Sequence, residues 1–518
     1  MSPSPEIPVV WSIAGADSAG GAGLAADQRA ADALGVHLCP VVAAVTAQHS
    51  RAVTRVDPVS AELLEAQLEA LAEDLPPRVV KTGLLGSAEH VRAVARWIDR
   101  LREAGPVALV VDPVLAASSG RGFADDATLT AYRDALLPRA TLVTPNRREA
   151  ERLAGRTPGA DDAPALARAL RGLGAQAVAV TGGDSADHDA LVLDWIATPQ
   201  AEGWLAAPRV ATPHHHGTGC TYASSAAAAL ALGFVAADAL VLAKMATLQA
   251  LRRGHAAGQG AGPVKAAPLP PDPTLLPGLS WGEAPVFAPA APAPDRPLDL
   301  YGIVDSAARV RRLLDAGVRT VQLRLKAAPD LEAQVRDSIA ACEAVGAMLF
   351  VNDHWQLAQR FGAAGVHLGQ EDLLALGESG RAALRASGLA LGISSHSLWE
   401  LARARTMAPR YLACGPVWPT LTKAMPWRPQ GLDNLAWWCA MAGAPVVAIG
   451  GLLEAAQFEA AARCGADGVC AVRVLGDAPA RIVPALNAAL HAGRQGRRAP
   501  VPALPHPSLD SGFTEARR

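Results

Sequence analysis

The chain has 518 residues, which is too long for a single hydrophobic core and predicts at least two domains. Half of the residues are hydrophobic and 19% are charged, so full-sized cores can be buried. The 47 basic and 49 acidic residues give a net charge of −2, which argues against nucleic acid or an anionic membrane as a partner. This net charge is compatible with local basic sites for small phosphates.

Targeting signals are not apparent in the sequence. Residues 1–6 do not combine a basic segment with an apolar core, so we expect no signal peptide. No apolar run approaches the ~20 residues of a membrane-spanning helix. The seven cysteines form no CxxC pair, and their odd number and scatter are typical of reduced, mostly buried thiols. We therefore expect a cytoplasmic protein.

The N-terminal half alternates short apolar runs with helix-period stretches, which predicts a three-layer α/β/α sandwich around a mostly parallel sheet. The expected strands are 9–13, 79–81, 107–111, 141–143, 177–180 and 191–195, and the expected helices include 23–34, 88–104 and 163–173.

Two glycine-rich segments interrupt this half. Residues 14–23 follow a strand and open a helix, but they lack the ending of a Walker loop and the glycine spacing of a dinucleotide fingerprint, so a plain tight turn is the more frequent explanation. Residues 216–221 read His-Gly-Thr-Gly-Cys-Thr directly before a helix-compatible run. Glycines let backbone N–H groups converge, and a helix N-terminus favours an anion there. A glycine cap beside a buried cysteine would explain this segment equally well on its own.

Six motifs that occur in one order favour a functional explanation of these two segments over a plain turn or cap. They are IAGADSAGGAGLAAD (13–27), TAQ (46–48), KTGLL (81–85), DPV with a following SG (112–120), TPNRREAERL (144–153) and HGTGCTYASSA (216–226). Together they closely resemble hydroxymethylpyrimidine/phosphomethylpyrimidine kinases of the ribokinase-like superfamily, over about residues 8–260.

The resemblance implies roles for particular residues. Gln48 and Gly15 would bind the pyrimidine, to which an amide offers both a donor and an acceptor. Asn146 and Glu149 would organise the Mg-ATP phosphates from one helix face. The remaining implied residues are Asp112 for metal and charge, Gly217, Thr218 and Gly219 as the anion hole, and Cys220 as the base or hydroxyl-orienting residue.

One position departs from the family pattern. Relatives usually have Lys-Gly-Gly-His before the loop that faces ATP, whereas this chain has Thr181-Gly182-Gly183-Asp184 and so lacks a lysine charge. The alternative is that the N-terminal half is a degenerate binding or scaffold module. The run His214–His216 could suggest a metal site, but adjacent residues cannot easily share one ion.

Residues 263–297 contain 11 of the 40 prolines, which predicts a linker of polyproline character. The residues after 493 are rich in proline, glycine and arginine, which predicts a disordered tail over 494–518. We therefore expect a kinase domain over 8–262 and a second domain over 298–493.

The second domain repeats strand and helix patterns eight times, which predicts a (β/α)8 TIM barrel. The expected strands are 298–304, 320–325, 348–351, 365–368, 389–393, 411–414, 446–449 and 468–472.

Polar residues fall at the C-terminal ends of these strands, where barrel enzymes place their chemistry. They are Gln322, Arg324, Lys326, Asn352, Asp353, Gln370, Asp372, Ser394, Thr420, Thr422, Lys423, Gly450 and Gly451. The carboxylates of Asp353 and Asp372 suit Mg²⁺, which also keeps waters and substrate phosphate oxygens. Arg324 and Lys326 would neutralise a phosphate leaving group. The pattern predicts a metal-assisted site for a phosphate ester.

Eight motifs of this half closely resemble thiamine-phosphate synthase over nearly all of 298–493. They are YGIVD (301–305), VQLRLK (321–326), VND (351–353), GVHLGQEDL (365–373), GISSHS (392–397), GPVWPTLTK (415–423), AIGG (448–451) and GADGV (465–469). The resemblance implies that hydroxymethylpyrimidine diphosphate loses pyrophosphate and that the nitrogen of thiazole phosphate captures the resulting cation.

On this resemblance, Gln322, Asn352 and Ser394 lie near the pyrimidine diphosphate, and Thr420, Thr422, Lys423 and Gly451 lie near the phosphate-bearing ends of both substrates. The usual Val-Ser after the eighth strand reads Val472-Arg473 here. The related thiazole tautomerases are the rival interpretation, but they need no diphosphate and metal site. We expect Mg²⁺ as cofactor, ATP as co-substrate, small-molecule substrates, no nucleic acid or membrane partner, and leave a homo-oligomer open.

Overall fold

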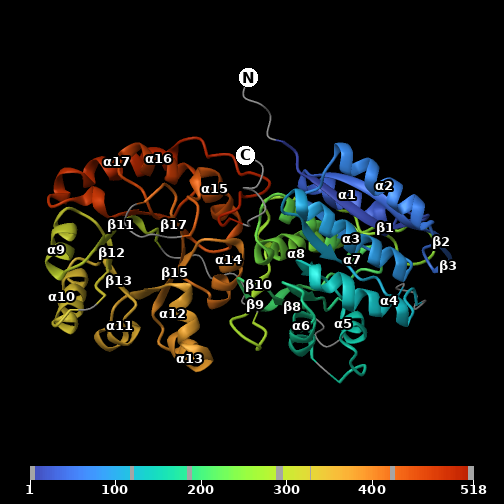
Figure 1. The fold of residues 1–518 in the computed structure, drawn as a ribbon. Helices are drawn as coiled ribbons and strands as arrows, with labels where there is room; N and C mark the ends of the chain where they lie inside the picture. Colours follow the sequence, from blue (N-terminus) through green and yellow to red (C-terminus); the bar gives the residue numbers. More distant parts are fainter. Residues whose placement is uncertain are drawn as a thin grey trace. The chain divides into compact units, whose positions relative to one another are not determined.

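The computed structural model describes residues 6–116, 122–160, 162–183, 190–286, 296–326, 328–420 and 426–510. The chain divides into two compact units, which we describe separately (Figure 1). The first comprises mainly Met1–Pro270 and Leu275–Pro285, and the second comprises Pro271–Thr274 and Val286–Leu509. Within the described ranges, no helix is both long enough and apolar enough to span a membrane.

The first unit is built around a 10-stranded sheet in the order β10-β9-β8-β7-β6-β5-β4-β1-β2-β3. Strands β2, β1, β4, β5, β6 and β7 run parallel, whereas β3 and β8–β10 join antiparallel. The strands are β1 (Val9–Asp17), β2 (His37–His49), β3 (Ala52–Pro58), β4 (Val79–Thr82), β5 (Ala108–Val111), β6 (Leu142–Val143), β7 (Val178–Val180), β8 (Leu191–Ala197), β9 (Glu202–Pro208) and β10 (Gly278–Leu279).

Helices cover both faces of this sheet, which confirms the predicted α/β/α sandwich (Figure 1). They are α1 (Gly23–Leu34), α2 (Ala61–Asp74), α3 (Ala88–Ala104), α4 (Asp126–Ala131), α5 (Arg147–Ala154), α6 (Ala163–Gly172), α7 (Thr218–Ala231) and α8 (Ala236–Arg252). Helices α1 and α7 pack together on one face, while residues of α2, α3, α5 and α6 share the core of the other.

Side-chain alternation along the strands decides what each face contains. Trp11 and Ile13 of β1 join the large apolar core beneath α2 and α3. Ser12, which lies between them, points to the opposite face and donates a hydrogen bond to Asp27 of α1. Lys81 of β4 has the same orientation, next to the apolar Val80. The face beneath α1 and α7 is therefore the polar one.

The second unit is a closed barrel of eight parallel strands in sequence order, as predicted. The strands are β11 (Asp299–Val304), β12 (Thr320–Leu323), β13 (Met348–Asn352), β14 (Gly365–Leu368), β15 (Ala390–Ser395), β16 (Tyr411–Cys414), β17 (Val446–Ala448) and β18 (Gly468–Ala471). The helices are α9 (Ala307–Asp315), α10 (Leu331–Glu343), α11 (Trp355–Phe361), α12 (Gln370–Ala375), α13 (Gly377–Ala386), α14 (Leu398–Ala404), α15 (Gly431–Met441), α16 (Ala455–Arg463) and α17 (Val483–Gln495).

Three aromatic rings fill the barrel interior. Tyr301, Phe350 and Tyr411 have ring centroids 5.2–5.8 Å apart. Gly365 and Gly392 make room for them, because a Cβ at these positions would lie 2.6 Å from the Phe350 ring and 2.2 Å from the Tyr411 ring. The small residues of β14 and β15 thus allow large side chains from β13 and β16 to meet inside a narrow barrel.

The predicted linker over 263–297 needs correction, because part of it is folded. Gly278 and Leu279 form β10 and pair with β9, and Leu275, Leu276 and Trp281 are buried. Averaging the composition over the whole stretch concealed this apolar segment between the prolines.

The predicted disordered tail over 494–518 is also wrong for the part that the structure describes. The backbone N–H of His506 donates to Asn434 of α15, its Nε2 lies 2.8 Å from the carbonyl oxygen of Gln430, and Ser508 is buried. Polar side chains of α15 supply partners that a proline-rich segment cannot supply for itself. Residues 511–518 lie outside the described ranges.

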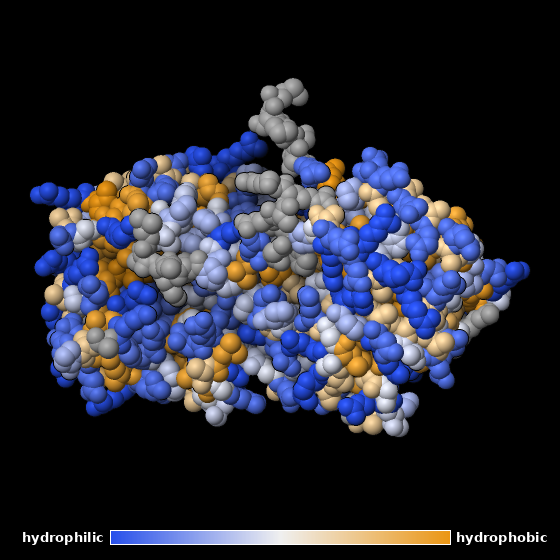
Figure 2. All heavy atoms as spheres, in the orientation of Figure 1, coloured by the Kyte–Doolittle hydropathy of each residue, from blue (hydrophilic) through white to orange (hydrophobic). Residues whose placement is uncertain are grey.

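The surface gives no sign of a continuous apolar band on the face drawn in Figure 2, where hydrophilic residues interrupt the hydrophobic ones on both units. The large exposed hydrophobic residues, such as Leu63, Val345 and Leu453, come from separate elements. Scattered apolar residues of this kind are ordinary for a protein surface.

Candidate active sites

The turn that opens α7 contains the three residues predicted to form an anion hole, of which Thr218 donates its backbone N–H to the His215 carbonyl oxygen. Gly217 has a φ of 85°, and a Cβ there would lie 2.2 Å from the carbonyl oxygen of Gly21, so only glycine fits. Thr218 begins the 14-residue helix α7, with its hydroxyl bonded to the His215 carbonyl, and Gly219 and Cys220 follow in the first turn. The positive end of the helix dipole therefore faces the polar side of the sheet next to Gly21.

Cys220 lies over a buried group of charges. Burial raises the pKa of its thiol to about 12, and Asp27 and Asp112 act in the same direction, while Lys81 and a backbone hydrogen bond with Gly23 oppose them. At neutral pH the thiol is therefore protonated in the unliganded protein. Such a thiol can orient a substrate hydroxyl more readily than it can remove its proton.

Asp112, at the end of β5, is the carboxylate of this group with the fewest partners. It is 6% exposed, and its Oδ2 atom lies 3.9 Å from Lys81 Nζ but has no hydrogen-bond partner within the described ranges. Burial raises its pKa to about 6, against the effect of the Lys81 cation. An acceptor left unpaired in this way is suited to a ligand, a water or a cation.

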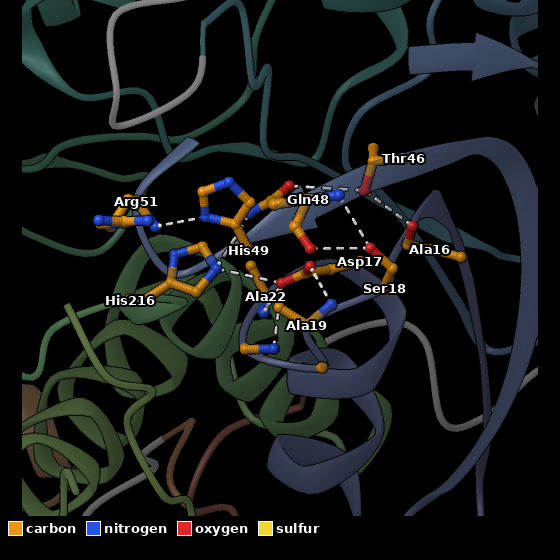
Figure 3. Close-up of polar contacts among 12 residues, drawn as sticks. Ala16, Asp17, Ser18, Ala19, Ala22, Thr46, Gln48, His49, Arg51 and His216 are labelled. Atoms are coloured by element: carbon orange, nitrogen blue, oxygen red, sulfur yellow. Dashed lines mark hydrogen bonds and ion pairs between the residues drawn. The ribbon is translucent and has the colours of Figure 1, made fainter. Parts of the chain in front are cut away.

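Gln48 belongs to a small polar network at the end of β2 (Figure 3). Its Nε2 atom lies 3.1 Å from Nε2 of His216, which in turn lies 3.1 Å from Oδ2 of Asp17. Asp17 also accepts backbone hydrogen bonds from Ala19, Gly21 and Ala22. Burial would raise the pKa of the Asp17 carboxyl, but the hydrogen bond with His216 and the backbone bonds from Ala19 and Ala22 lower it overall. Histidine at 216 thus joins the proposed pyrimidine side of the site to the anion-hole turn, a link that the sequence reasoning missed.

Gly15 lies on the neighbouring strand, at a register shift between Ala14 and Gly15 of β1. A Cβ at Gly15 would contact the Leu84 side chain at 3.2 Å. The first glycine-rich segment therefore packs against the KTGLL motif, and Gly23 must be glycine because a Cβ there would lie 2.1 Å from the Gly15 carbonyl.

Asn146 and Glu149 form a capping box at the start of α5. The Asn146 side chain accepts from the Glu149 N–H, and the Glu149 carboxylate accepts from the Asn146 N–H. Glu149 Oε1 also accepts from the N–H of Leu115, three residues after Asp112. Both residues thus have a structural role that is sufficient to account for their presence, and their assignment to ATP stays a prediction.

Thr181 follows β7 and bridges to Asn146, so the two predicted nucleotide-side segments lie side by side. The next residue, Gly182, donates its N–H to Asp194, whose other oxygen is bonded to Lys244 of α8 at 2.7 Å. The buried Lys244 therefore stabilises the segment that follows Thr181 through Asp194, although no lysine occupies position 181. Asp184 lies outside the described residues.

In the barrel, Asp353, Asp372, Arg324 and Lys326 form one charged cluster at the C-terminal strand ends. Burial raises the pKa of Asp353, and the negative charge of Asp372 raises it further, while His354, Arg324 and Lys326 lower it. Asp353 has a φ of 66°, an uncommon conformation for an aspartate, and its N–H bonds to the His367 carbonyl. Asp372 Oδ2 caps α12 through the Gly369 N–H.

The amides predicted near the pyrimidine diphosphate also meet. Gln322 Nε2 donates to Asn352 Oδ1 at 3.1 Å, and both side chains are buried. Ser394 Oγ lies 2.9 Å from Nε2 of His367, whose Nδ1 lies 2.8 Å from the Tyr411 hydroxyl. That hydroxyl lies 2.7 Å from the hydroxyl of Tyr301. The structure thus brings Ser394 to the end of a buried chain of polar groups.

Sequence reasoning missed His367 and Tyr411, although both lie on predicted strands. Their signal was an unusual polar residue at an inward-facing position, because His367 and Tyr411 alternate with buried aliphatic residues on β14 and β16. Burial lowers the pKa of His367 to about 4, with Arg324 and His396 acting in the same direction. The ring is therefore neutral at physiological pH.

Gly451 follows β17 with a φ of 75°, and a Cβ there would lie 2.5 Å from Trp418 Cβ. Gly450 similarly packs against Pro416. The glycines therefore bring the seventh strand end against the segment that leads to Thr420. Thr422 and Lys423 lie outside the described residues, and Arg473 opens a short 3-10 turn after β18.

Comparison with known proteins agrees with this division. The family model for phosphomethylpyrimidine kinase matches residues 17–265, and that for thiamine monophosphate synthase matches residues 300–475. The chain is 34% identical to a probable thiamine biosynthetic bifunctional enzyme, chloroplastic, of Oryza sativa subsp. japonica, over 93% of this chain and 88% of the relative. The chain belongs to the bifunctional thiamine biosynthetic enzymes.

Each half is also similar to separate enzymes. The kinase half is 42% identical to a hydroxymethylpyrimidine/phosphomethylpyrimidine kinase of Synechococcus elongatus, over 50% of this chain and 97% of the relative. The barrel is 48% identical to a thiamine-phosphate synthase of Serratia proteamaculans, over 36% of this chain and 88% of the relative. The protein is therefore a bifunctional transferase of thiamine biosynthesis, and a purely scaffolding N-terminal half is not favoured.

Proposed function

We propose that the first unit phosphorylates hydroxymethylpyrimidine and its phosphate with ATP at the turn that opens α7. The observation that carries this proposal is the placement of Cys220 at a helix N-terminus, over the buried charges of Lys81 and Asp112. Backbone N–H groups of Gly217, Thr218 and Gly219 stabilise charge on the transferring phosphoryl group. Cys220 orients the attacking hydroxyl, and Gln48 and Gly15 bind the pyrimidine.

On the nucleotide side, we place Asn146, Glu149 and Asp112. The contact of Glu149 with the backbone of Leu115 supports this grouping, because it connects the start of α5 with the segment after Asp112. Mg²⁺ bound with ATP would supply charge neutralisation between the phosphates. Lys244 is bonded to Asp194, and Asp194 accepts a hydrogen bond from the N–H of Gly182, so this pair stabilises the start of the loop after Thr181.

The barrel then joins the pyrimidine diphosphate to thiazole phosphate. Arg324 and Lys326 stabilise the departing pyrophosphate, and Gln322, Asn352 and Ser394 hold the pyrimidine. Thr420, Thr422, Lys423 and Gly451 are assigned to the phosphate-bearing ends of the substrates. The bond between pyrimidine methylene carbon and diphosphate oxygen breaks, and the thiazole nitrogen then supplies the electron pair for the new bond.

The donor set of the barrel suits Mg²⁺. Asp353 and Asp372 are hard oxygen ligands, and a cation would offset the burial and the Asp372 charge that raise the pKa of Asp353. Within the described part of the chain, no three His, Cys, Asp or Glu side chains converge as a complete metal cage. Two carboxylates leave room for the waters and diphosphate oxygens that Mg²⁺ prefers. The ion would neutralise the leaving group.

One incubation tests both reactions. The full chain is mixed with hydroxymethylpyrimidine, thiazole phosphate and Mg-ATP, and each phosphorylated species is followed by mass spectrometry. We expect the pyrimidine phosphate, its diphosphate and thiamine phosphate in succession. Accumulation of the diphosphate without thiamine phosphate would contradict the barrel assignment, and failure to form any pyrimidine phosphate would contradict the kinase assignment.

A magnesium titration tests the metal assignment. Asp353→Asn should raise the Mg²⁺ concentration for half-maximal synthase activity about tenfold, equivalent to about 1.4 kcal/mol of binding free energy. Asp305→Asn is the matched control, because Asp305 is an exposed carboxylate directly after β11. The assignment fails if the two variants titrate alike.

We place the enzyme in the cytoplasm. All seven cysteines are free thiols, and most are buried, which suits a reducing compartment. Its partners on this proposal are hydroxymethylpyrimidine, its phosphate, thiazole phosphate and ATP. Cell fractionation with an antibody to the chain tests the location.

A further inference from the structure

A buried cluster of four polar side chains lies directly beneath the proposed kinase site, and three of the four have no role in the reaction proposed above. Asp27 of α1 accepts hydrogen bonds from Ser12 at 2.7 Å, from Lys81 at 2.9 Å and from Ser224 at 2.7 Å. All four side chains are at most 2% exposed. We call Ser12, Asp27, Lys81 and Ser224 the Asp27 cluster.

The cluster joins four different elements. Ser12 comes from β1, Asp27 from α1, Lys81 from β4 and Ser224 from α7. Residues four apart lie on the same face of a helix, so Ser224 lies directly below Cys220 on α7. The one hydrogen bond from Ser224 therefore ties the first turns of α7 to the sheet through Asp27.

The charges in the cluster are closely balanced. Burial alone would lower the pKa of Lys81, but the carboxylates of Asp27 and Asp112 raise it overall, so Lys81 remains a cation. Both oxygens of Asp27 are bonded to Lys81 Nζ, which fixes the orientation of the carboxylate. A buried ion pair is weak evidence for stability, since desolvation offsets most of the attraction, but it orients its neighbours strongly.

We propose that Asp27 and Lys81 are positioning residues of the kinase. Through Ser224 they fix the first turn of α7, which holds residues 217–220 against the phosphoryl group. The inference rests on the proposed kinase function of that turn. A displacement of about 1 Å at a reacting group can lower a rate roughly 100-fold. The expected consequence of loosening the cluster is therefore a lower kcat with substrate binding largely unchanged.

Neighbouring serines on α7 provide a matched pair of variants. Ser224 bonds to Asp27, whereas Ser225 is equally buried but its hydroxyl has no hydrogen-bond partner among the described residues. Ser224→Ala should lower kinase kcat about tenfold and leave the KM values for ATP and pyrimidine within about twofold. Ser225→Ala should retain the wild-type kcat. The proposal is overturned if the two variants behave alike or if Ser224→Ala changes only the KM values.

Amide hydrogen exchange of the full-length chain, without substrates, tests the positioning step separately from the reaction. The peptide spanning residues 217–225 should exchange faster in Ser224→Ala than in Ser225→Ala. Equal exchange in the two variants would overturn the inference, whatever the enzyme phosphorylates. If exchange differs but no pyrimidine is phosphorylated even by the wild type, the proposed kinase function fails and the positioning of α7 by the cluster stands.

Lys81→Met gives a second, stronger test. It leaves Asp27 charged, so the variant is first checked for synthase activity and for its melting temperature. A folded Lys81→Met variant should lose more kcat than Ser224→Ala, because the carboxylate loses its fixed orientation. A folded variant with wild-type kcat would overturn the proposal. If the kinase half fails to fold, the comparison of Ser224→Ala with Ser225→Ala decides.

Discussion

At the scale of single residues, each half contains a titratable side chain whose pKa lies far from its ordinary value. The Cys220 thiol has its pKa raised to about 12, and the His367 imidazole has its pKa lowered to about 4. In each case burial is the main cause, because it disfavours the charged form. Both groups are therefore neutral at pH 7, and the His367 ring lies within hydrogen-bond distance of Ser394 and Tyr411.

Cys220→Ala should lower the kinase kcat about 100-fold, since a positioned acid-base or orienting group typically contributes at least that factor. Synthase activity on supplied pyrimidine diphosphate should not change. Cys39→Ala is the matched control, because Cys39 is a buried thiol of the same unit that lies on β2, in the apolar core. Equal kinase rates in the two variants would remove Cys220 from the site.

His367 predicts a pH dependence of stability. Its pKa is lower in the folded state than in the unfolded state, so the unfolded chain binds more protons between pH 6.5 and about 4. The contribution of the neutral His367 ring to the free energy of unfolding is therefore present above pH 6.5 and is lost as the pH falls toward 4. Between pH 6.5 and 5 this site alone lowers the free energy of unfolding by about 2 kcal/mol, at about 1.4 kcal/mol per pH unit.

The measurement compares denaturant unfolding of the wild type with that of His367→Gln, in which the amide keeps a donor and an acceptor but does not titrate. Other groups contribute equally to both proteins, so the difference between the two pH profiles belongs to His367. Parallel profiles between pH 7 and 5 would mean that the histidine is not held in its neutral form.

At the scale of elements, a glycine-rich strap over residues 254–264 connects the two sides of the kinase site. Gly260 donates its N–H to Ser50 Oγ in the turn between β2 and β3, and Gly262 donates to His214 Nδ1. The backbone of His216 bonds to both Gly262 and Val264. The strap therefore fixes the turn next to Gln48 and the segment that leads into α7.

Gly260→Ala tests the strap, because a Cβ there would lie 2.2 Å from the Ser50 carbonyl oxygen. The turn must move, and Gln48 lies two residues away, so the KM for pyrimidine should rise about three- to tenfold, or about 0.7–1.4 kcal/mol. Gly172→Ala is the control, since open space surrounds that glycine at the end of α6. Steady-state kinetics with hydroxymethylpyrimidine measure both variants. An unchanged KM in Gly260→Ala would show that the turn does not position Gln48.

Sequence patterns predicted those elements whose apolar period matches their burial. The bounds of α1 and α3 follow from such periods, and the periods place the ends of all eight barrel strands to within two residues. The edge strand β3 and its neighbour β2 were missed, since several of their side chains are exposed and their pattern is interrupted by polar residues. The Asp27 cluster was missed for a different reason: its members lie far apart in sequence, and only the sheet register brings Ser12 next to Lys81.

At the scale of the whole molecule, the folded segment around β10 changes where the chain can be divided. A fragment ending near residue 264 would lose β10 together with the buried Leu275, Leu276 and Leu279. A fragment over residues 1–286 retains this edge of the sheet. The connection between residues 286 and 296 is correspondingly shorter than the 35 residues suggested by proline content alone.

The kinase product is the synthase substrate, which raises the question of direct transfer between the two halves. A tether raises the local concentration of one site near another but does not align them. We therefore predict diffusive coupling: fragments 1–286 and 296–518, mixed in equal amounts, should sustain nearly the same steady flux to thiamine phosphate as the intact chain.

Competition distinguishes diffusion from transfer. An excess of a barrel fragment that binds the pyrimidine diphosphate but cannot turn it over is added to each system as a trap. With diffusive coupling, the trap should inhibit the intact chain and the mixed fragments to the same degree, because the intermediate enters solution in both. Strong inhibition of the mixture alone would demonstrate direct transfer, and would require the two sites to exchange the diphosphate faster than it escapes.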